Sequence, residues 1–356
     1  MEAKGYRKAA RRFGKVSKII GADDPYNYRN KVQAVFRSDR NGRIISGVYQ
    51  SSRNGIVGID SCMLDDKRAD EIIVGIRELL RSFKLHPYDE GTERGFLRHV
   101  LVRVGKNTGE ILVTLVGGNS MFPKKHDFVK ALVKRFPDIT TVTFSVNRTP
   151  EMLLLGENSE VLYGEGYITD ILCGKRFRIS PHSFYQINHA QTEKLYDYAI
   201  KAAKLTKKDV LLDAYSGIGT IGIIASDYVK QVQGIEYNAS AVRDAVKNCH
   251  ENGLTRNIAF NRGDAGEFLE KKAKLGTHYD AVILDPARTG ADRKFLNSLI
   301  KIAPERIVYI SCNPATQARD LKTLTKKYTV TDIQPFDMFP HTRHVECVVV
   351  MSRKAE

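Results

Sequence analysis

The sequence has few cysteines, and their spacing argues against a clustered metal site. The five are Cys62, Cys173, Cys249, Cys312 and Cys347. No two of them form the CxxC pair that zinc ribbons and many iron–sulfur sites use. Their odd number and wide separation are typical of reduced thiols. We therefore expect a cytoplasmic protein that holds no metal.

Long apolar runs and a secretory leader are missing as well. No stretch approaches the roughly 20 apolar residues that a membrane-spanning helix needs, so we expect no membrane partner. The basic first residues are not followed by an apolar stretch, which argues against a secretory signal. With 356 residues, 42% of them hydrophobic, the chain is long enough for two folded domains. Nothing in the sequence demands more than a monomer.

Acidic residues are the minority among the charged ones. The chain has 56 Lys and Arg against 41 Asp and Glu, a net charge of +15. Such an excess favours a polyanionic partner, most often a nucleic acid. The basic residues are dense near the start, although a solvated terminal helix would look the same. This group consists of Lys4, Arg7, Lys8, Arg11, Arg12, Lys15 and Lys18.

The first part of the chain predicts a compact α+β domain over residues 1–160. Two Asn-Gly pairs, the strongest hairpin signal, separate short apolar runs between residues 31 and 60. An apolar stripe at helical spacing follows. The expected elements are three strands within 31–60, a helix at 65–83, a hairpin at 96–116, a helix at 125–136 and a strand at 139–148. A connecting segment, 161–205, with a strand pair near 167–179 and a helix to about 205, would then lead to a second domain, 206–356.

The second domain shows strict alternation of apolar runs and helical stretches. The expected strands are 210–215, 232–237, 258–264, 279–285 and 306–312. This rhythm is that of an α/β fold with a Rossmann-like, doubly wound, mostly parallel sheet. Ligands of such sheets bind beyond the carboxyl ends of the strands. The residues expected at those ends are Asp213, Tyr215, Glu236, Asp264, Asp285 and Cys312.

A glycine-rich turn follows the first of these strands. Gly217, Gly219 and Gly222 match GxGxxG, and Glu236 ends the next strand, where an acid can accept from ribose hydroxyls. Both a dinucleotide and S-adenosylmethionine fit this pattern. Asp213 favours S-adenosylmethionine, since a carboxylate repels a pyrophosphate but attracts an ammonium group. A helix cap at Asp213 and a plain strand–helix turn are the alternatives.

Cys312 stands where the last predicted strand meets a helix. The apolar run 307–310 ends before it, and Pro314 is suited to the first helical position. The positive end of a helix dipole favours the reactive thiolate, so we expect a lowered thiol pKa. A small buried packing residue is the alternative.

These motifs together resemble the RNA uracil-C5-methyltransferase family, whose members make 5-methyluridine in tRNA and 23S rRNA. The similar segments are ISPHSFYQIN (179–188), LLDAYSGIGTIG (211–222), GIEYN (234–238), LDPARTG (284–290), SCNPATQARDL (311–321) and PHTRHVECVVVM (340–351). YRNKVQ (28–33) and LRHVLVR (97–103) look like the family's central, RNA-contacting domain. The resemblance implies a class I S-adenosylmethionine-dependent methyltransferase with an N-terminal α+β domain.

Carried over residue by residue, the family pattern makes Cys312 the nucleophile and Glu346 the general base. The cofactor or its pocket would be contacted by Gln186, Tyr215, Glu236 and Asp285, with Asp213, Gly217 and Asp264 as further candidates near the cofactor. Many family members also carry a TRAM domain and a four-cysteine iron–sulfur site. This sequence begins too late for the first and lacks the cysteines for the second. It is therefore either complete without them or a fragment, and we expect no cluster.

The expected reaction is methyl transfer from S-adenosylmethionine to C5 of a uridine in RNA, through a covalent bond between Cys312 and C6 of uracil. We expect 23S rRNA as the substrate, with tRNA as the alternative. GxGxxG alone would also suit a nicotinamide-dependent oxidoreductase. The non-enzyme alternative is a basic RNA-binding protein with an inactive methyltransferase fold.

Overall fold

The computed structural model describes residues 12–50, 55–149 and 155–355, so the basic residues before Arg12 lie outside the described part. The chain divides into two compact units. The N-terminal unit comprises Tyr26–Ile171 and Arg178–His182; the C-terminal unit comprises the chain up to Pro25, Leu172–Phe177 and the residues from Ser183 onward. Among the described residues, no helix is both long and apolar enough to cross a lipid bilayer.

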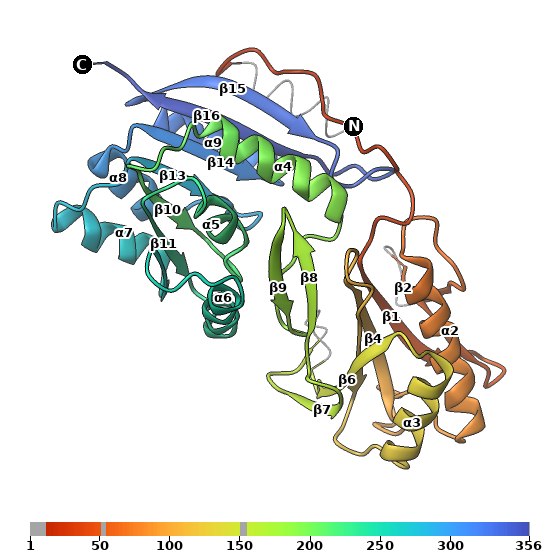
Figure 1. Cartoon of the computed structure of the whole chain (residues 1–356). Helices are drawn as coiled ribbons and strands as arrows, with labels where there is room; N and C mark the ends of the chain where they lie inside the picture. Colours follow the sequence, from red (N-terminus) through yellow and green to blue (C-terminus); the bar gives the residue numbers. More distant parts are fainter. Residues whose placement is uncertain (1–11, 51–54, 150–154, 356) are drawn as a thin grey trace. The chain divides into compact units, whose positions relative to one another are not determined.

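The N-terminal unit is built on a seven-stranded sheet in the order β3-β2-β1-β4-β5-β6-β7. Its strands pair antiparallel, except that β5 and β6 run parallel. Two helices supply residues to the core on one side of this sheet (Figure 1). The elements are β1 (Lys31–Ser38), β2 (Ile44–Tyr49), β3 (Ile56–Gly58), α2 (Lys67–Ser82), β4 (Leu97–Val104), β5 (Ile111–Gly117), α3 (Lys125–Arg135), β6 (Ile139–Val146) and β7 (Ser159–Tyr163).

Helix α2 shows why this sequence forms its elements where it does. Asp66 caps its start by accepting from the backbone N–H of Arg68 at 3.1 Å. An apolar stripe that includes Ile72, Ile76 and Leu80 is fully buried against the sheet. The expected helix at 65–83 is therefore confirmed. Strand β7 is an element that the sequence analysis did not predict.

The C-terminal unit is a Rossmann-like α/β fold with strand order β12-β11-β10-β13-β14-β16-β15. The five predicted strands pair in parallel, and β15 and β16 extend the sheet antiparallel. The strands are β10 (Val210–Ala214), β11 (Gln231–Glu236), β12 (Ile258–Arg262), β13 (Ala281–Leu284), β14 (Arg306–Ser311), β15 (Tyr328–Phe336) and β16 (Glu346–Arg353). The hairpin of β8 (Ile168–Leu172) and β9 (Lys175–Ile179) links the two units along the chain.

Helices cover both faces of this sheet, as a doubly wound fold requires (Figure 1). On one face, Leu269, Phe295 and Leu321 of three successive helices join the core beneath β10, β13 and β14. The helices are α4 (His189–Ala202), α5 (Thr220–Ala225), α6 (Ala239–Glu251), α7 (Ala265–Lys274), α8 (Arg293–Ile302) and α9 (Pro314–Leu324).

Residues 12–25 belong to the C-terminal unit, although the sequence analysis grouped them with the N-terminal domain. The backbone N–H of Ser17 donates to the carbonyl of Ile333 in β15 at 2.9 Å, and that of Ile20 donates to Pro335 at 3.0 Å. A short extended segment carries no local signal for the sheet it will join. Only the long-range contacts decide that pairing.

Candidate functional site

Cys312 and Glu346 lie beside each other at one edge of the C-terminal sheet. Strands β14 and β16 pair antiparallel with Ser311 opposite Cys347. Continuing that register by one residue sets Cys312 opposite Glu346. Opposed residues of antiparallel strands share a face, with Cα atoms about 4.5–5.5 Å apart. The thiol and the carboxyl group therefore lie on the same side, while Cys347 points to the other and is fully buried in the core.

The segment after Cys312 begins helix α9 as predicted. Asn313 is the cap residue, and its side chain accepts from the N–H of Ala315 at 3.1 Å. Pro314 occupies the first helical turn. The Asn313 side chain also donates to the carbonyl of Arg288 at 2.9 Å, so the loop after β13 holds the start of α9 in place.

The predicted lowering of the Cys312 pKa is wrong for this site. Burial, together with the charges of Glu346 and Asp285, raises the pKa of the thiol to about 11. Cys312 precedes the cap residue, so it lies outside the first helical turn, where the dipole acts most strongly. Burial and two nearby acids outweigh the dipole.

Asp285 and Glu346 form a second pair of interacting groups. Burial raises the pKa of Asp285 to about 7. Glu346 is only 4% exposed, and burial followed by the charge of Asp285 raises its pKa well above the usual value. One of its carboxyl oxygens, Oε2, has no hydrogen-bond partner among the described residues. Two buried acids that repel each other retain a proton near neutral pH.

Arg288 is a site residue that the sequence analysis missed. Its guanidinium group hydrogen-bonds the Cys312 thiol, and its positive charge opposes the rise in pKa of both Cys312 and Glu346. Its Nη2 lies 2.8 Å from Nδ1 of His344. The LDPARTG segment contained the signal, since it places a cation directly after the strand end that carries Asp285.

The glycine turn after β10 is arranged around two acids. Glu236 at the end of β11 accepts from the N–H of Gly217 at 3.0 Å, and Asp213 accepts from the N–H of Gly222 at 2.8 Å. Gly217 has a φ of +55°, which favours glycine, and a Cβ there would meet nothing within 4 Å. Open space therefore lies over the turn, while both carboxylates support it from the sheet.

These features fit S-adenosylmethionine better than a pyrophosphate. Oδ1 of Asp213 is buried and has no hydrogen-bond partner among the described residues. The carboxyl groups of Asp213, Glu236 and Asp285 lie near one another here, and the charges of Asp285 and Glu236 add to the rise in the pKa of Asp213. A cationic ligand is attracted to such a site, whereas phosphate groups are repelled. The open backbone at Gly217 allows close approach.

Gln186 lies in the same region, beside a second residue that the sequence analysis missed. Gln186 is buried and hydrogen-bonds the hydroxyl of Tyr196 on α4. Burial raises the pKa of Tyr196, and the charges of Asp285 and Asp213 add to the effect. Its hydroxyl therefore lies near the strand ends that carry the two acids. Its helical position gave no sequence signal beyond that of a core aromatic residue.

Two predicted cofactor residues have other contacts. The ring of Tyr215 packs on Phe295, with ring centroids 5.3 Å apart, and its φ of +63° turns the chain toward the helices. Asp264 is exposed and caps α7 by accepting from the N–H of Glu267 at 2.9 Å. Capping accounts for what the structure shows of Asp264, whereas the Tyr215 hydroxyl is buried with no hydrogen-bond partner among the described residues.

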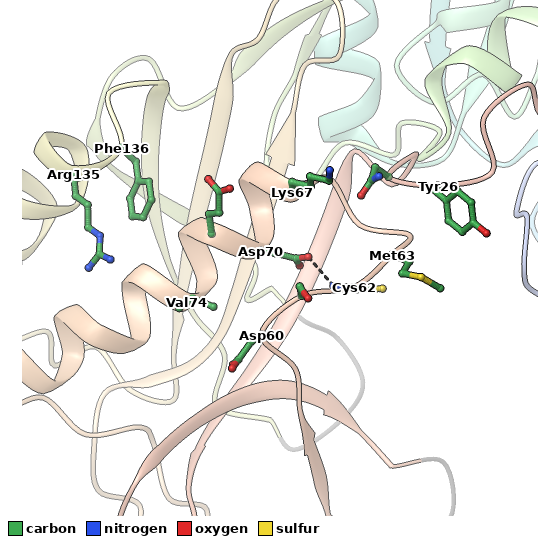
Figure 2. Close-up of a pocket in the computed structure, with 12 residues that line it drawn as sticks. Tyr26, Asp60, Cys62, Met63, Lys67, Asp70, Val74, Arg135 and Phe136 are labelled. Atoms are coloured by element: carbon green, nitrogen blue, oxygen red, sulfur yellow. Dashed lines mark hydrogen bonds between the residues drawn. The ribbon is translucent and has the colours of Figure 1, made fainter.

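Cys62 lies in the N-terminal unit at a cavity of about 850 Å³ (Figure 2). Figure 2 shows the carboxylate of Asp70 directed at the backbone of Cys62. The carboxylate accepts a hydrogen bond from the Cys62 N–H at 2.8 Å. The thiol accepts from the N–H of Leu64 at 3.4 Å. Within the described ranges, no group of three His, Cys, Asp or Glu residues is arranged to hold a metal ion. These contacts give Cys62 and Asp70 roles in shaping the loop.

Replacement of Asp213 by Asn should remove a pH dependence of stability. Burial raises the pKa of Asp213 from 3.8 to about 7. Between these values the folded state binds more protons than the unfolded state, so the free energy of unfolding falls as the pH rises. Wild type should therefore lose up to about 4 kcal/mol relative to Asp213→Asn between pH 4 and pH 8, in urea unfolding. Exposed Asp197 offers a control, Asp197→Asn; equal pH profiles in wild type and Asp213→Asn would contradict the prediction.

Known proteins are similar to this chain over most of its length. The family model for tRNA (uracil-5-)-methyltransferases matches residues 157–354. An uncharacterized RNA methyltransferase of Halalkalibacterium halodurans is 39% identical over 349 residues, which cover 96% of this chain and 76% of the relative. One of Oceanobacillus iheyensis is 40% identical over 341 residues, covering 95% and 74%.

A solved structure is similar over nearly the full chain. It is the tRNA (uracil-54, C5)-methyltransferase of Pyrococcus abyssi in complex with S-adenosyl-L-homocysteine. The TM-score is 0.79 and the sequence identity 28%, covering 98% of this chain and 82% of the other. The strand-end acids, the open glycine turn and these likenesses agree, and the chain belongs to the family of S-adenosylmethionine-dependent RNA (uracil-5-)-methyltransferases.

Proposed function

We propose that the chain methylates C5 of a uridine in RNA through a covalent intermediate on Cys312, with Glu346 as the base that completes the reaction. The observation that carries this proposal is the register of β14 and β16, which sets the two residues opposite each other. A nucleophile and a base that act on one pyrimidine ring must lie within reach of the same ring.

Each residue has a definite step in this mechanism. The Cys312 thiolate forms a bond to C6 of uracil, and the electrons of the C5–C6 double bond move to the C4 carbonyl as an enolate. Bound S-adenosylmethionine supplies a methyl group to the carbon nucleophile at C5. Glu346 then takes the remaining proton from C5, the double bond re-forms and the sulfur leaves C6 as thiolate. Arg288 stabilises the thiolate at the start and at the end.

We propose that Gln186, Asp213, Gly217, Glu236 and Asp285 bind the methyl donor or line its pocket. The unpartnered Oδ1 of Asp213 and the negative charge around the turn support a cationic donor. Tyr215 joins them as a candidate, since its hydroxyl is buried with no hydrogen-bond partner among the described residues, whereas Asp264 is a weaker one because its capping contact suffices to explain it. Family membership favours this function over a nicotinamide-dependent oxidoreductase and over an inactive RNA-binding protein.

The RNA substrate is the finer part of the proposal. From the sequence we expect 23S rRNA as the substrate, and we propose a monomeric enzyme in the cytoplasm. A tRNA is the second candidate, because the similar Pyrococcus abyssi enzyme is named for uracil 54 of tRNA. The net charge of +15 suits either polyanion.

Cells that lack this protein should lose one 5-methyluridine from their RNA. Mass spectrometry of separated rRNA and tRNA would map the lost modification, and return of the wild-type gene should restore it. If 5-methyluridine is lost from tRNA alone, the substrate is tRNA and not rRNA. Unchanged 5-methyluridine in both RNAs would contradict the proposed function.

A further inference from the structure

The sheet of the N-terminal unit has a second face that its helices do not cover. Side chains alternate between the two faces of a strand. Val32, Ala34 and Phe36 of β1 point into the core with α2 and α3. Gln33 and Arg37 therefore point to the opposite face. The register sets Val35 opposite both Gly47 of β2 and His99 of β4, so these strands contribute Tyr49 and His99 to the same face.

Four side chains on this face form a surface that we name the stacking face: Gln33, Arg37, Tyr49 and His99. Tyr49 is 49% exposed and Gln33 is exposed too. The rings of Tyr49 and His99 meet edge to face at 6.1 Å. The guanidinium group of Arg37 lies 5.7 Å from the centre of the Tyr49 ring. Gly47 lies against the backbone of Val57, and Val35 beside it is buried, so the exposed part of this face is formed by Gln33 and Tyr49.

The strands of the stacking face carry cations, one of which is paired: Arg98 forms an ion pair with Glu90 at 2.6 Å. Strands β1, β2, β3 and β4 contain no Asp or Glu, whereas β1 carries Lys31 and Arg37 and β4 carries Arg98 and Arg103. Burial, together with the nearby cations Arg98 and Arg37, lowers the pKa of His99 to about 4. His99 is therefore neutral at physiological pH. A neutral aromatic ring is suited to stacking with a base.

We propose that the stacking face binds unpaired nucleotides of the RNA substrate, with a base stacked on Tyr49 and a phosphate near Arg37. Exposed aromatic rings beside cations on a sheet are a common way to hold single-stranded RNA, because every base has a stacking surface. The positive charge favours the backbone of a polyanion. This proposal rests on the proposed function and extends it by naming where RNA is held.

Fluorescence anisotropy with a labelled, single-stranded RNA that contains uridines tests the proposal without turnover, since no methyl donor is added. Tyr49→Ala should weaken RNA binding by about 10- to 100-fold, the usual loss for one stacked base. Tyr49→Phe should bind like wild type because it keeps the ring. Gln33→Glu, at an exposed position, should weaken binding by adding a negative charge.

Tyr163 provides the matched control, since it is 43% exposed on β7 at the far edge of the same sheet. Tyr163→Ala should leave RNA affinity unchanged, and all variants should keep wild-type affinity for S-adenosylhomocysteine. Equal RNA affinity of Tyr49→Ala and wild type would overturn the proposal. A wild-type protein that binds RNA through Tyr49 but makes no 5-methyluridine would instead overturn the proposed function and leave the stacking face standing.

Discussion

Cys312→Ala should abolish methylation of RNA and prevent any covalent protein–RNA adduct. Without the thiolate that adds to C6, C5 of uracil stays a weak nucleophile. We expect activity to fall by on the order of 10⁴-fold or more, as when other covalent nucleophiles are removed. Transfer of a labelled methyl group measures the rate, and a shift of the protein band in a denaturing gel detects the adduct.

A second thiol gives the control for this experiment. Cys249 is buried in the C-terminal unit on α6, and Cys249→Ala should keep both activity and adduct. The pH adds an independent check. Because the Cys312 thiol has a pKa of about 11, adduct formation should rise about tenfold per pH unit below that value. Full activity of Cys312→Ala would refute its role as nucleophile.

Glu346→Gln should have a different effect, since the base acts after the adduct has formed. The variant should still add Cys312 to C6 and accept the methyl group, but it cannot remove the proton from C5. We expect release of the methylated RNA to slow by about 10²- to 10⁴-fold, the usual contribution of a general base. The covalent adduct should therefore accumulate, which single-turnover experiments with labelled RNA would show.

Glu305 is an exposed glutamate of the same unit, and Glu305→Gln should release product like wild type. The raised pKa of Glu346 predicts that release in wild type becomes faster as the pH increases, because a proton must leave the carboxyl group before it can act as a base. A Glu346→Gln variant that releases RNA at the normal rate would remove Glu346 from the mechanism.

Much of the fold was predictable because its signals are local. Apolar runs between helical stretches predicted the five parallel strands, and the Asn-Gly pairs predicted the first hairpins. The strands β7 and β15 were not predicted. In β15, Tyr328 and Ile333 are fully buried in the core of the C-terminal unit, and the strand pairs with β16 and is hydrogen-bonded by Ser17 and Ile20. Long-range pairing, which has no local signature, decided those two elements.

The candidate site divides in the same way. The sequence alone determined the order and chemical type of the strand-end residues, since motif spacing fixes where a thiol or an acid follows a strand. Only the tertiary structure decided that Cys312 opposes Glu346, that Arg288 and Tyr196 belong to the site, and that the thiol pKa rises to about 11. Strand register is fixed only when strands far apart in the sequence pair. That pairing also fixes burial and the distances between charges, which set a pKa.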